Sequence, residues 1–133
     1  MSQREQRPVS QKADAVAKSV VDAAYRVHYE LGPGLLEDVY EACLSHELRK
    51  RNLGLEQQVV MPVEYDGVRL ETGYRLDLVV EGCVIVELKA VENLLPVHQA
   101  QLLTYLKLTG HRLGLLINFN VPKIKQGIRR VVL

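Results

Sequence analysis

Apolar residues in the first third of the chain recur at helical spacing and predict two helices. From residue 12 to residue 31 they return every three or four positions, until Gly32-Pro33 ends the run. A second helix is expected to begin near Leu35. The basic run 49–51 suits the C-terminal end of that helix, where the helix dipole favours positive charge, and we prefer this interpretation to phosphate binding. The buried stripe of the second helix is expected to comprise Leu36, Tyr40, Cys43, Leu44 and Leu48.

The pattern then changes from helical to alternating, which indicates strands. Residues 59–65 suit a strand at a sheet edge, because Pro62 cannot donate a ladder hydrogen bond. Asp66-Gly67 is a hairpin signal. A second strand is therefore expected over about residues 68–80, with a bulge or bend at Gly73.

The rest of the chain continues with alternating strand and helix signals. Glu81-Gly82 turns the chain into a third strand over about residues 83–89. Residues 96–109 read as a helix, with proline in its first turn and glycine just past its end. Residues 113–119 are almost continuously apolar, as expected of a strand covered on both faces, and 128–133 predict a short last strand.

Length and composition favour one small domain. The chain has 133 residues, which suits a single domain over residues 12–133 preceded by a flexible arm over residues 1–11. The net charge of +1 argues against a coat of positive charge but leaves a local basic groove open. No apolar run is long enough to span a bilayer and the first residues do not read as a secretory signal, so we expect a cytoplasmic protein.

Ionisable residues occur where the third strand should be buried. Both faces of this strand begin apolar, yet Glu87 and Lys89 follow on one face. Burying a charge is costly unless it is paired or bound to a metal. The hairpin at 81–82 makes the second and third strands antiparallel neighbours, so Asp77 is expected roughly opposite residues 86 to 87. The residues expected on the other face of the second strand are Tyr74, Leu76, Leu78 and Val80.

A pair of neighbouring carboxylates predicts a metal site. The two charges repel one another, and a divalent cation removes the conflict by taking oxygen ligands from both. Magnesium prefers one or two carboxylates together with water and phosphate oxygens. Lys89 points the same way as Glu87 and could orient an attacking water or offset charge on phosphorus. The alternative is a structural Glu87–Lys89 ion pair with Asp77 solvated at an edge, which the spacing alone would favour.

These residues carry a family resemblance. The chain resembles the PD-(D/E)XK nuclease superfamily and, more narrowly, the small bacterial GxxExxY proteins assigned to it. The GxxExxY motif is present as residues 34–40, the superfamily acid as Asp77 and the E-x-K motif as residues 87–89. The Q-x-x-x-Y motif of some members is present as Gln101 to Tyr105. Each motif is weak alone, but together they follow the order and the elements of the family.

The resemblance covers about residues 12 to 120, with one departure: Leu76 precedes the acid where many members have proline. It implies that Glu37 completes the acidic site, either on the metal or through a water. The residues themselves leave open a first-turn glutamate that only helps the helix to start. The resemblance also implies that Gln101 lies near the metal and Tyr105 contacts substrate phosphate. Their spacing alone is equally compatible with a glutamine and a tyrosine satisfied in the core.

We therefore expect an α/β fold of the restriction-endonuclease-like type, with a mixed four- or five-stranded sheet flanked by helices. The expected activity is hydrolysis of phosphodiester bonds in DNA, or secondarily RNA, with Mg²⁺ or Mn²⁺. Asp77 and Glu87 would bind the metal with the Leu88 carbonyl, supported by Glu37 and Lys89. The alternative is a non-cleaving nucleic-acid-binding or protein-interaction module on the same fold. A homodimer or a protein partner would supply binding surface that so small a domain lacks, and no membrane association is expected.

Overall fold

The computed structural model describes residues 8–133, apart from the side chain of Thr72. The predicted arm therefore falls largely on residues 1–7, which lie outside the described residues, and the first helix already begins at Gln11. Within the described part of the chain, no helix is both long enough and apolar enough to cross a membrane. The elements in chain order are α2 (Gln11–Leu31), α3 (Glu37–Lys50), β1 (Leu55–Tyr65), β2 (Val68–Val80), β3 (Val84–Lys89), α4 (Pro96–Thr109), β4 (Leu113–Asn118), η1 (Ile124–Gly127) and β5 (Ile128–Val132).

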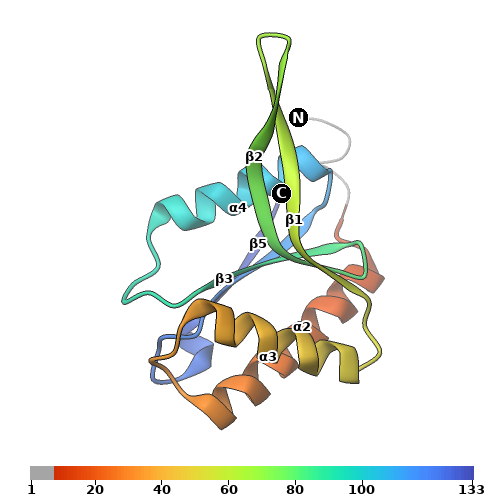
Figure 1. Cartoon of the computed structure of the whole chain (residues 1–133). Helices are drawn as coiled ribbons and strands as arrows, with labels where there is room; N and C mark the ends of the chain where they lie inside the picture. The colour runs from red at the N-terminus through yellow and green to blue at the C-terminus, as the bar shows by residue number, and fades with distance from the viewer. Residues whose placement is uncertain (1–7) are drawn as a thin grey trace.

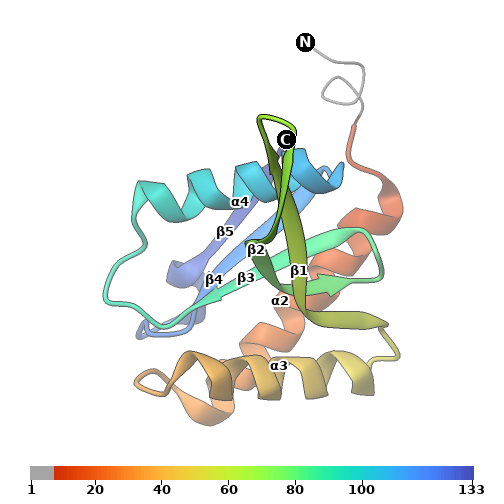
Figure 2. The ribbon, with the colours of Figure 1, turned by 45° about the horizontal axis from the view of Figure 1, so that its top comes forward.

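The five strands form one mixed sheet in the order β1-β2-β3-β4-β5. β3 and β4 are parallel and are joined through α4, while the other neighbours are antiparallel. Helices α2 and α3 cover one face of the sheet and α4 covers the other (Figures 1 and 2). This is the α/β, restriction-endonuclease-like arrangement that the sequence predicted, with five strands and with β1 at an edge.

The sheet separates two apolar cores. Val84, Val86 and Leu88 of β3 belong to the core beneath α2 and α3. Ile85 belongs to the core beneath α4, together with Leu102 of that helix. Because side chains alternate along a strand, the two charged residues that follow Ile85 on its face are directed toward α4. The fold thus brings the end of β3 to the gap between the helical layers.

The loop before α3 is held by a buried tyrosine. The Tyr40 hydroxyl donates to the Gly32 carbonyl at 2.6 Å and accepts from the Leu35 N–H at 3.1 Å, and its ring stacks on Phe119 with centroids 4.6 Å apart. The helix consequently begins at Glu37, and Leu36, which was expected in the buried stripe, is 77% exposed as its N-cap. The tyrosine of the GxxExxY motif, by holding Gly32 and Leu35, therefore fixes where α3 starts and with it the position of Glu37.

The β1–β2 hairpin turns a corner at Gln58. Leu78 packs in the core beneath α3, whereas Leu76 packs in the core beneath α4, so the prediction that Tyr74, Leu76, Leu78 and Val80 share one face was wrong. Gln58 lies between the pairs Gln57–Leu78 and Val59–Leu76, and its φ of 52° is in the left-handed region. The strand pair twists there, which turns the outer hairpin away from the layer of α2 and α3 (Figure 1).

The outer hairpin follows its predicted turn chemistry. Asp66 and Gly67 have φ values of 51° and 74°, as a tight turn with two left-handed residues requires. Gly73 lies opposite the register shift between Met61 and Val63, and a Cβ at Gly73 would lie 2.2 Å from the Val63 side chain. The predicted turn and bulge are both confirmed.

Candidate active site

The backbone pairing of β2 with β3 ends at Leu78–Val86. Beyond this pair, the carboxylates of Asp77 and Glu87 accept hydrogen bonds from the backbone of the opposite strand. The Glu87 Oε1 atom accepts from the Asp77 N–H at 3.0 Å, and the Asp77 Oδ2 atom accepts from the Leu88 N–H at 2.8 Å. Each side chain thus satisfies a backbone donor of the opposite strand, which would otherwise be unpaired as the strands diverge. Asp77 and Glu87 lie next to one another because of these reciprocal bonds.

Glu87 is an unusually buried acid. Only 5% of the surface of this residue is exposed to solvent. Burial, followed by the negative charge of Asp77, raises the pKa of Glu87 to about 8, although the hydrogen bond from the Asp77 backbone and the charge of Lys89 lower it. Glu87 therefore keeps its proton at neutral pH unless a cation offsets the two causes that raise its pKa.

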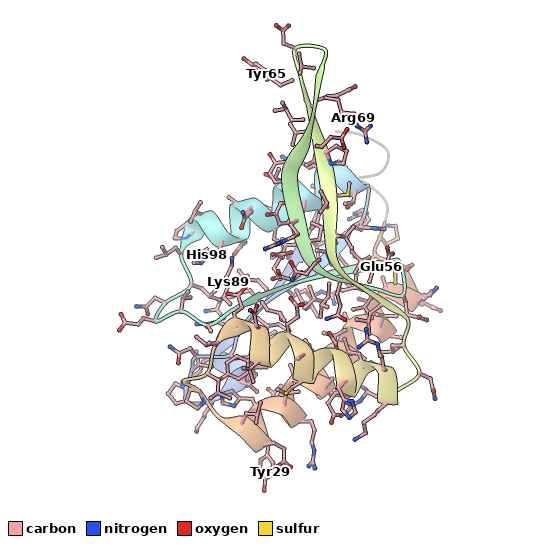
Figure 3. All side chains as sticks on the ribbon, viewed as in Figure 1. Tyr29, Glu56, Tyr65, Arg69, Lys89 and His98 are labelled. Carbon is pink, nitrogen blue, oxygen red and sulfur yellow. The ribbon has the colours of Figure 1, made fainter. Side chains whose placement is uncertain are left out.

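Helix α3 adds a third carboxylate to this pair. Glu37 is half-buried in the first turn of α3. Its pKa is raised by burial and then by Asp77, while the positive charge of Lys89 lowers it. Lys89 lies between α3 and α4 (Figure 3). The structure thus brings Glu37, Asp77, Glu87 and Lys89 within electrostatic reach of each other where β2 and β3 separate.

Two further residues join this cluster that the sequence did not indicate. The Gln58 amide group donates to Glu41 Oε1, and its contact with Asp77 Oδ1 measures 3.5 Å. Burial and then Asp77 raise the pKa of Glu41, while the hydrogen bond from Gln58 lowers it. Glu41 could have been found from its position four residues after Glu37, on the same helix face. Gln58 carried no sequence signal, because a left-handed glutamine within a strand is uncommon.

Helix α4 closes the cluster from the opposite layer. Tyr105 is 4% exposed, and burial, followed by the charges of Glu87 and Asp77, raises its pKa to about 12. Its ring meets Tyr74 edge-on with centroids 5.3 Å apart. Gln101 is exposed one turn earlier, and its hydrogen bond lowers the pKa of Tyr105. Tyr105 thus packs in the core and also faces the acids, while Gln101 lies at the rim.

One known family matches nearly the whole length of the chain. A profile described as the PD-(D/E)XK nuclease superfamily matches residues 14–131. The chain belongs to the PD-(D/E)XK nuclease superfamily. The match spans every predicted site residue, from Glu37 to Tyr105. The narrower assignment to the GxxExxY proteins stays a prediction. No curated protein and no solved structure showed significant similarity to the chain.

Nucleases of this superfamily generally use divalent metal ions, and the oxygen atoms present in the cluster decide whether such an ion fits here. Among residues 8–133, no three His, Cys, Asp or Glu side chains are already gathered as a metal centre. The available oxygens nevertheless suit magnesium. Asp77 and Glu87 each use one oxygen for a backbone N–H, and the second Asp77 oxygen has a 3.5 Å contact with the Gln58 amide. Mg²⁺ needs only one or two carboxylates beside water and phosphate oxygens.

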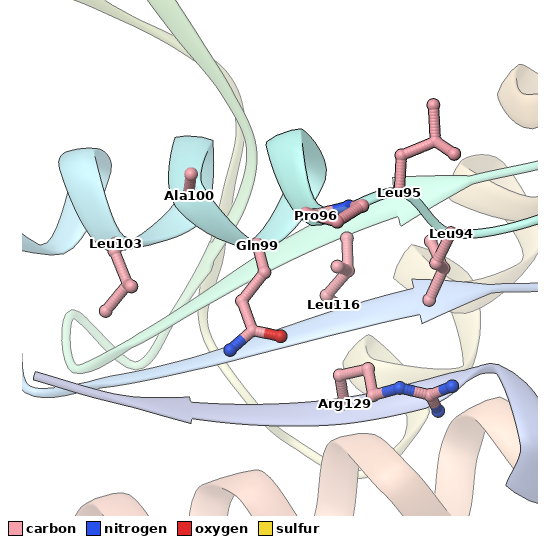
Figure 4. Close-up of a pocket in the computed structure, with 8 residues that line it drawn as sticks. All are labelled: Leu94, Leu95, Pro96, Gln99, Ala100, Leu103, Leu116 and Arg129. Atoms are coloured by element: carbon pink, nitrogen blue, oxygen red, sulfur yellow. The ribbon is translucent and has the colours of Figure 1, made fainter.

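A groove beside α4 is separate from this cluster of acids. It has a volume of about 460 Å³ and is lined by residues that include Leu95, Gln99, Leu103 and Arg129 (Figure 4). Gln99 and Leu103 lie on the flank of α4 opposite to Gln101 and Tyr105, by the 100° rotation per residue of a helix. The helix therefore separates the groove from the acids.

Proposed function

We propose that this protein is a magnesium-dependent phosphodiesterase that hydrolyses nucleic acid, with DNA as the first substrate to test and RNA as the second. One observation carries the proposal. Asp77 and Glu87 are locked together by reciprocal backbone hydrogen bonds, and Glu87 is buried at a pKa of about 8 that a bound cation would lower. Membership of the nuclease superfamily supports the same chemistry.

In this proposal Asp77, Glu87 and the Leu88 carbonyl hold the metal, with Mg²⁺ preferred and Mn²⁺ as a substitute. When bound, the ion supplies a Lewis acid for the phosphodiester and lowers the pKa of a bound water. The backbone bond from Leu88 to Asp77 orients that carboxylate before the ion arrives. Lys89, on the same face as Glu87, orients the attacking water or offsets negative charge on the phosphoryl oxygens.

The neighbouring residues support this centre from both helical layers. Glu37 contacts the metal directly or through a water, and its pKa is already raised by Asp77. Gln58 donates to Glu41 and approaches Asp77, so it positions one acid against the other. In the same proposal Gln101 lies near the metal, and Tyr105 contacts a substrate phosphate.

The test is cleavage of labelled single- and double-stranded DNA and of RNA, with Mg²⁺, with Mn²⁺ and with chelator. Glu87→Gln and Lys89→Met should each abolish cleavage, because they remove a metal ligand and the ammonium group. Glu92→Gln and Lys107→Met make the same changes at exposed positions and should leave cleavage intact. Binding of nucleic acid without cleavage in any metal would overturn the proposal in favour of a non-cleaving module. Gel filtration of the same samples tests for a homodimer.

A further inference from the structure

Charge is distributed very unevenly along this nearly neutral chain. Residues 93–133 contain six lysines and arginines and no aspartate or glutamate. The preceding 92 residues contain eleven lysines and arginines and sixteen aspartates and glutamates. The net charge of +1 therefore conceals a C-terminal third whose sequence contains six positive side chains and no acidic one.

Three of these cations lie at one edge of the sheet, next to Lys89. β3 and β4 are parallel, so Lys89 is paired with Asn118 at the ends of both strands. η1 and β5 begin at this same edge, since Ile128 pairs with Ile117. The three exposed cations, which we call the basic edge, are Lys123, Lys125 and Arg129.

The backbone beneath the basic edge is tightly held. The Phe119 N–H donates to the Lys89 carbonyl at 3.0 Å, which joins this segment directly to the site. The Asn118 side chain donates to the Val91 carbonyl at 2.9 Å and accepts from the Val91 N–H at 3.1 Å. The His28 ring bonds the Val121 carbonyl at 2.8 Å. A positive surface on a fixed backbone loses little entropy when an anion binds.

Within the described part of the chain, the members of the basic edge have no acidic partner. None of the ion pairs within residues 8–133 includes Lys123, Lys125 or Arg129. Arg130, the neighbour of Arg129, is paired instead with Asp14. Arg129 holds its own place by donating to the Gln126 and Ile128 carbonyls at 3.0 and 3.1 Å, and it stands at the rim of the groove (Figure 4). Exposed cations without an acidic partner on a fixed backbone suit a polyanion.

We propose that Lys123, Lys125 and Arg129 bind the phosphate backbone of the nucleic-acid strand that extends from the Asp77–Glu87 site. This inference rests on the proposed nuclease function for the identity of the polyanion. Phosphate contacts supply affinity without reading sequence, so this binding would not depend on the base sequence of the strand. The acids at the site repel phosphates, so the basic edge would offset that repulsion beside the reacting centre.

The test measures binding of labelled DNA and RNA oligonucleotides of one sequence in chelator, over a range of salt concentrations. The triple variant Lys123→Gln/Lys125→Gln/Arg129→Gln removes the basic edge. The matched control Arg49→Gln/Lys50→Gln/Arg51→Gln removes three positive charges from the end of α3. Each phosphate contact contributes about 0.7 to 0.9 to the slope of log affinity against log salt. The edge variant should therefore lose about 2 to 3 of that slope and about tenfold or more in affinity.

The control should keep the wild-type slope, and Arg129→Lys, which keeps the charge, should keep it too. Equal slopes for the edge variant and the control, or no binding of either oligonucleotide by the wild type, would overturn the inference. Hydrolysis of bis(4-nitrophenyl) phosphate with Mg²⁺ tests the proposed phosphodiesterase activity independently of the basic edge. This substrate is a single phosphodiester, so it has no neighbouring phosphates for the basic edge to bind. The edge variant should hydrolyse it at the wild-type rate. Absence of all hydrolysis together with a lost salt slope would refute the nuclease and leave the basic edge standing.

Discussion

Replacing Glu87 by glutamine should stabilise the metal-free protein, and increasingly so as the pH rises. Glutamine has the same shape and keeps an oxygen for the Asp77 N–H, but it cannot ionise. The pKa of Glu87 is about 8 in the folded chain against 4.5 for an ordinary glutamate. Below pH 4.5 the acid is protonated in both the folded and the unfolded chain, so its raised pKa does not lower the unfolding free energy of the wild type there.

Between pH 4.5 and 8 the unfolded chain releases this proton and the folded chain does not, so the wild type loses stability as the pH rises. Each tenfold change in proton affinity corresponds to about 1.4 kcal/mol. The full window would therefore cost the wild type up to about 5 kcal/mol, which is large against a typical domain stability of about 5 to 15 kcal/mol. Glu87→Gln does not undergo this loss.

Urea unfolding in chelator at pH 5, 6, 7 and 8 measures the effect. The difference in unfolding free energy between Glu87→Gln and wild type should grow steadily across this range, while other titrating groups affect both proteins alike. Glu92→Gln reports what the same substitution does at an exposed position. Adding Mg²⁺ at pH 8 should restore stability to the wild type and leave Glu87→Gln unchanged. Parallel pH curves for wild type and Glu87→Gln would refute the account of the buried acid.

Three other substitutions test separate parts of the site. Tyr40→Phe removes both hydrogen bonds of the buried hydroxyl and should lower the unfolding free energy by about 1 to 3 kcal/mol, measured by urea unfolding; an unchanged midpoint would contradict this. Gln58→Gly relieves about 1 kcal/mol of left-handed strain but removes the amide between Glu41 and Asp77. Mg²⁺ affinity by calorimetry should fall about 10- to 100-fold, and wild-type affinity would exclude a positioning role. Lys89→Met should abolish cleavage while keeping the Mg²⁺-induced rise in melting temperature, and loss of both would make Lys89 a requirement for metal binding.

The sequence predicted the elements well because each rests on local information. Helical spacing, a proline at the start of α4 and a glycine at its end determine where that helix lies. The pairing of β2 with β1 and with β3 followed from turn chemistry, and the edge position of β1 followed from Pro62, whereas the places of β4 and β5 in the sheet were not predicted. The boundaries were less accurate, because the beginning of α3 depends on Tyr40 reaching back to Gly32, a contact that spacing alone does not reveal.

For the candidate site, the sequence predicted only what the alternation of side chains along a strand can indicate. Alternation correctly directed Glu87 toward the face of Ile85, but it failed for Leu76 because the hairpin twists at Gln58. The reciprocal bonds between Asp77 and Glu87 also could not be predicted, since they exist only because the ladder ends one residue earlier. Those features depend on three-dimensional twist, which a periodic pattern does not encode.

The corner in the β1–β2 hairpin divides it into two parts with different tolerance to change. Gln58 and Asp77 mark the inner part, whereas the tip at Asp66-Gly67 stands apart from the rest of the molecule with Tyr65 and Val68 exposed (Figures 1 and 3). A fluorophore, an affinity tag or a whole guest domain spliced into that tip would be carried at a distance from the acids. The tip of the hairpin is thus a suitable place for engineered insertions, and a place where related sequences can differ in length without disturbing the acids.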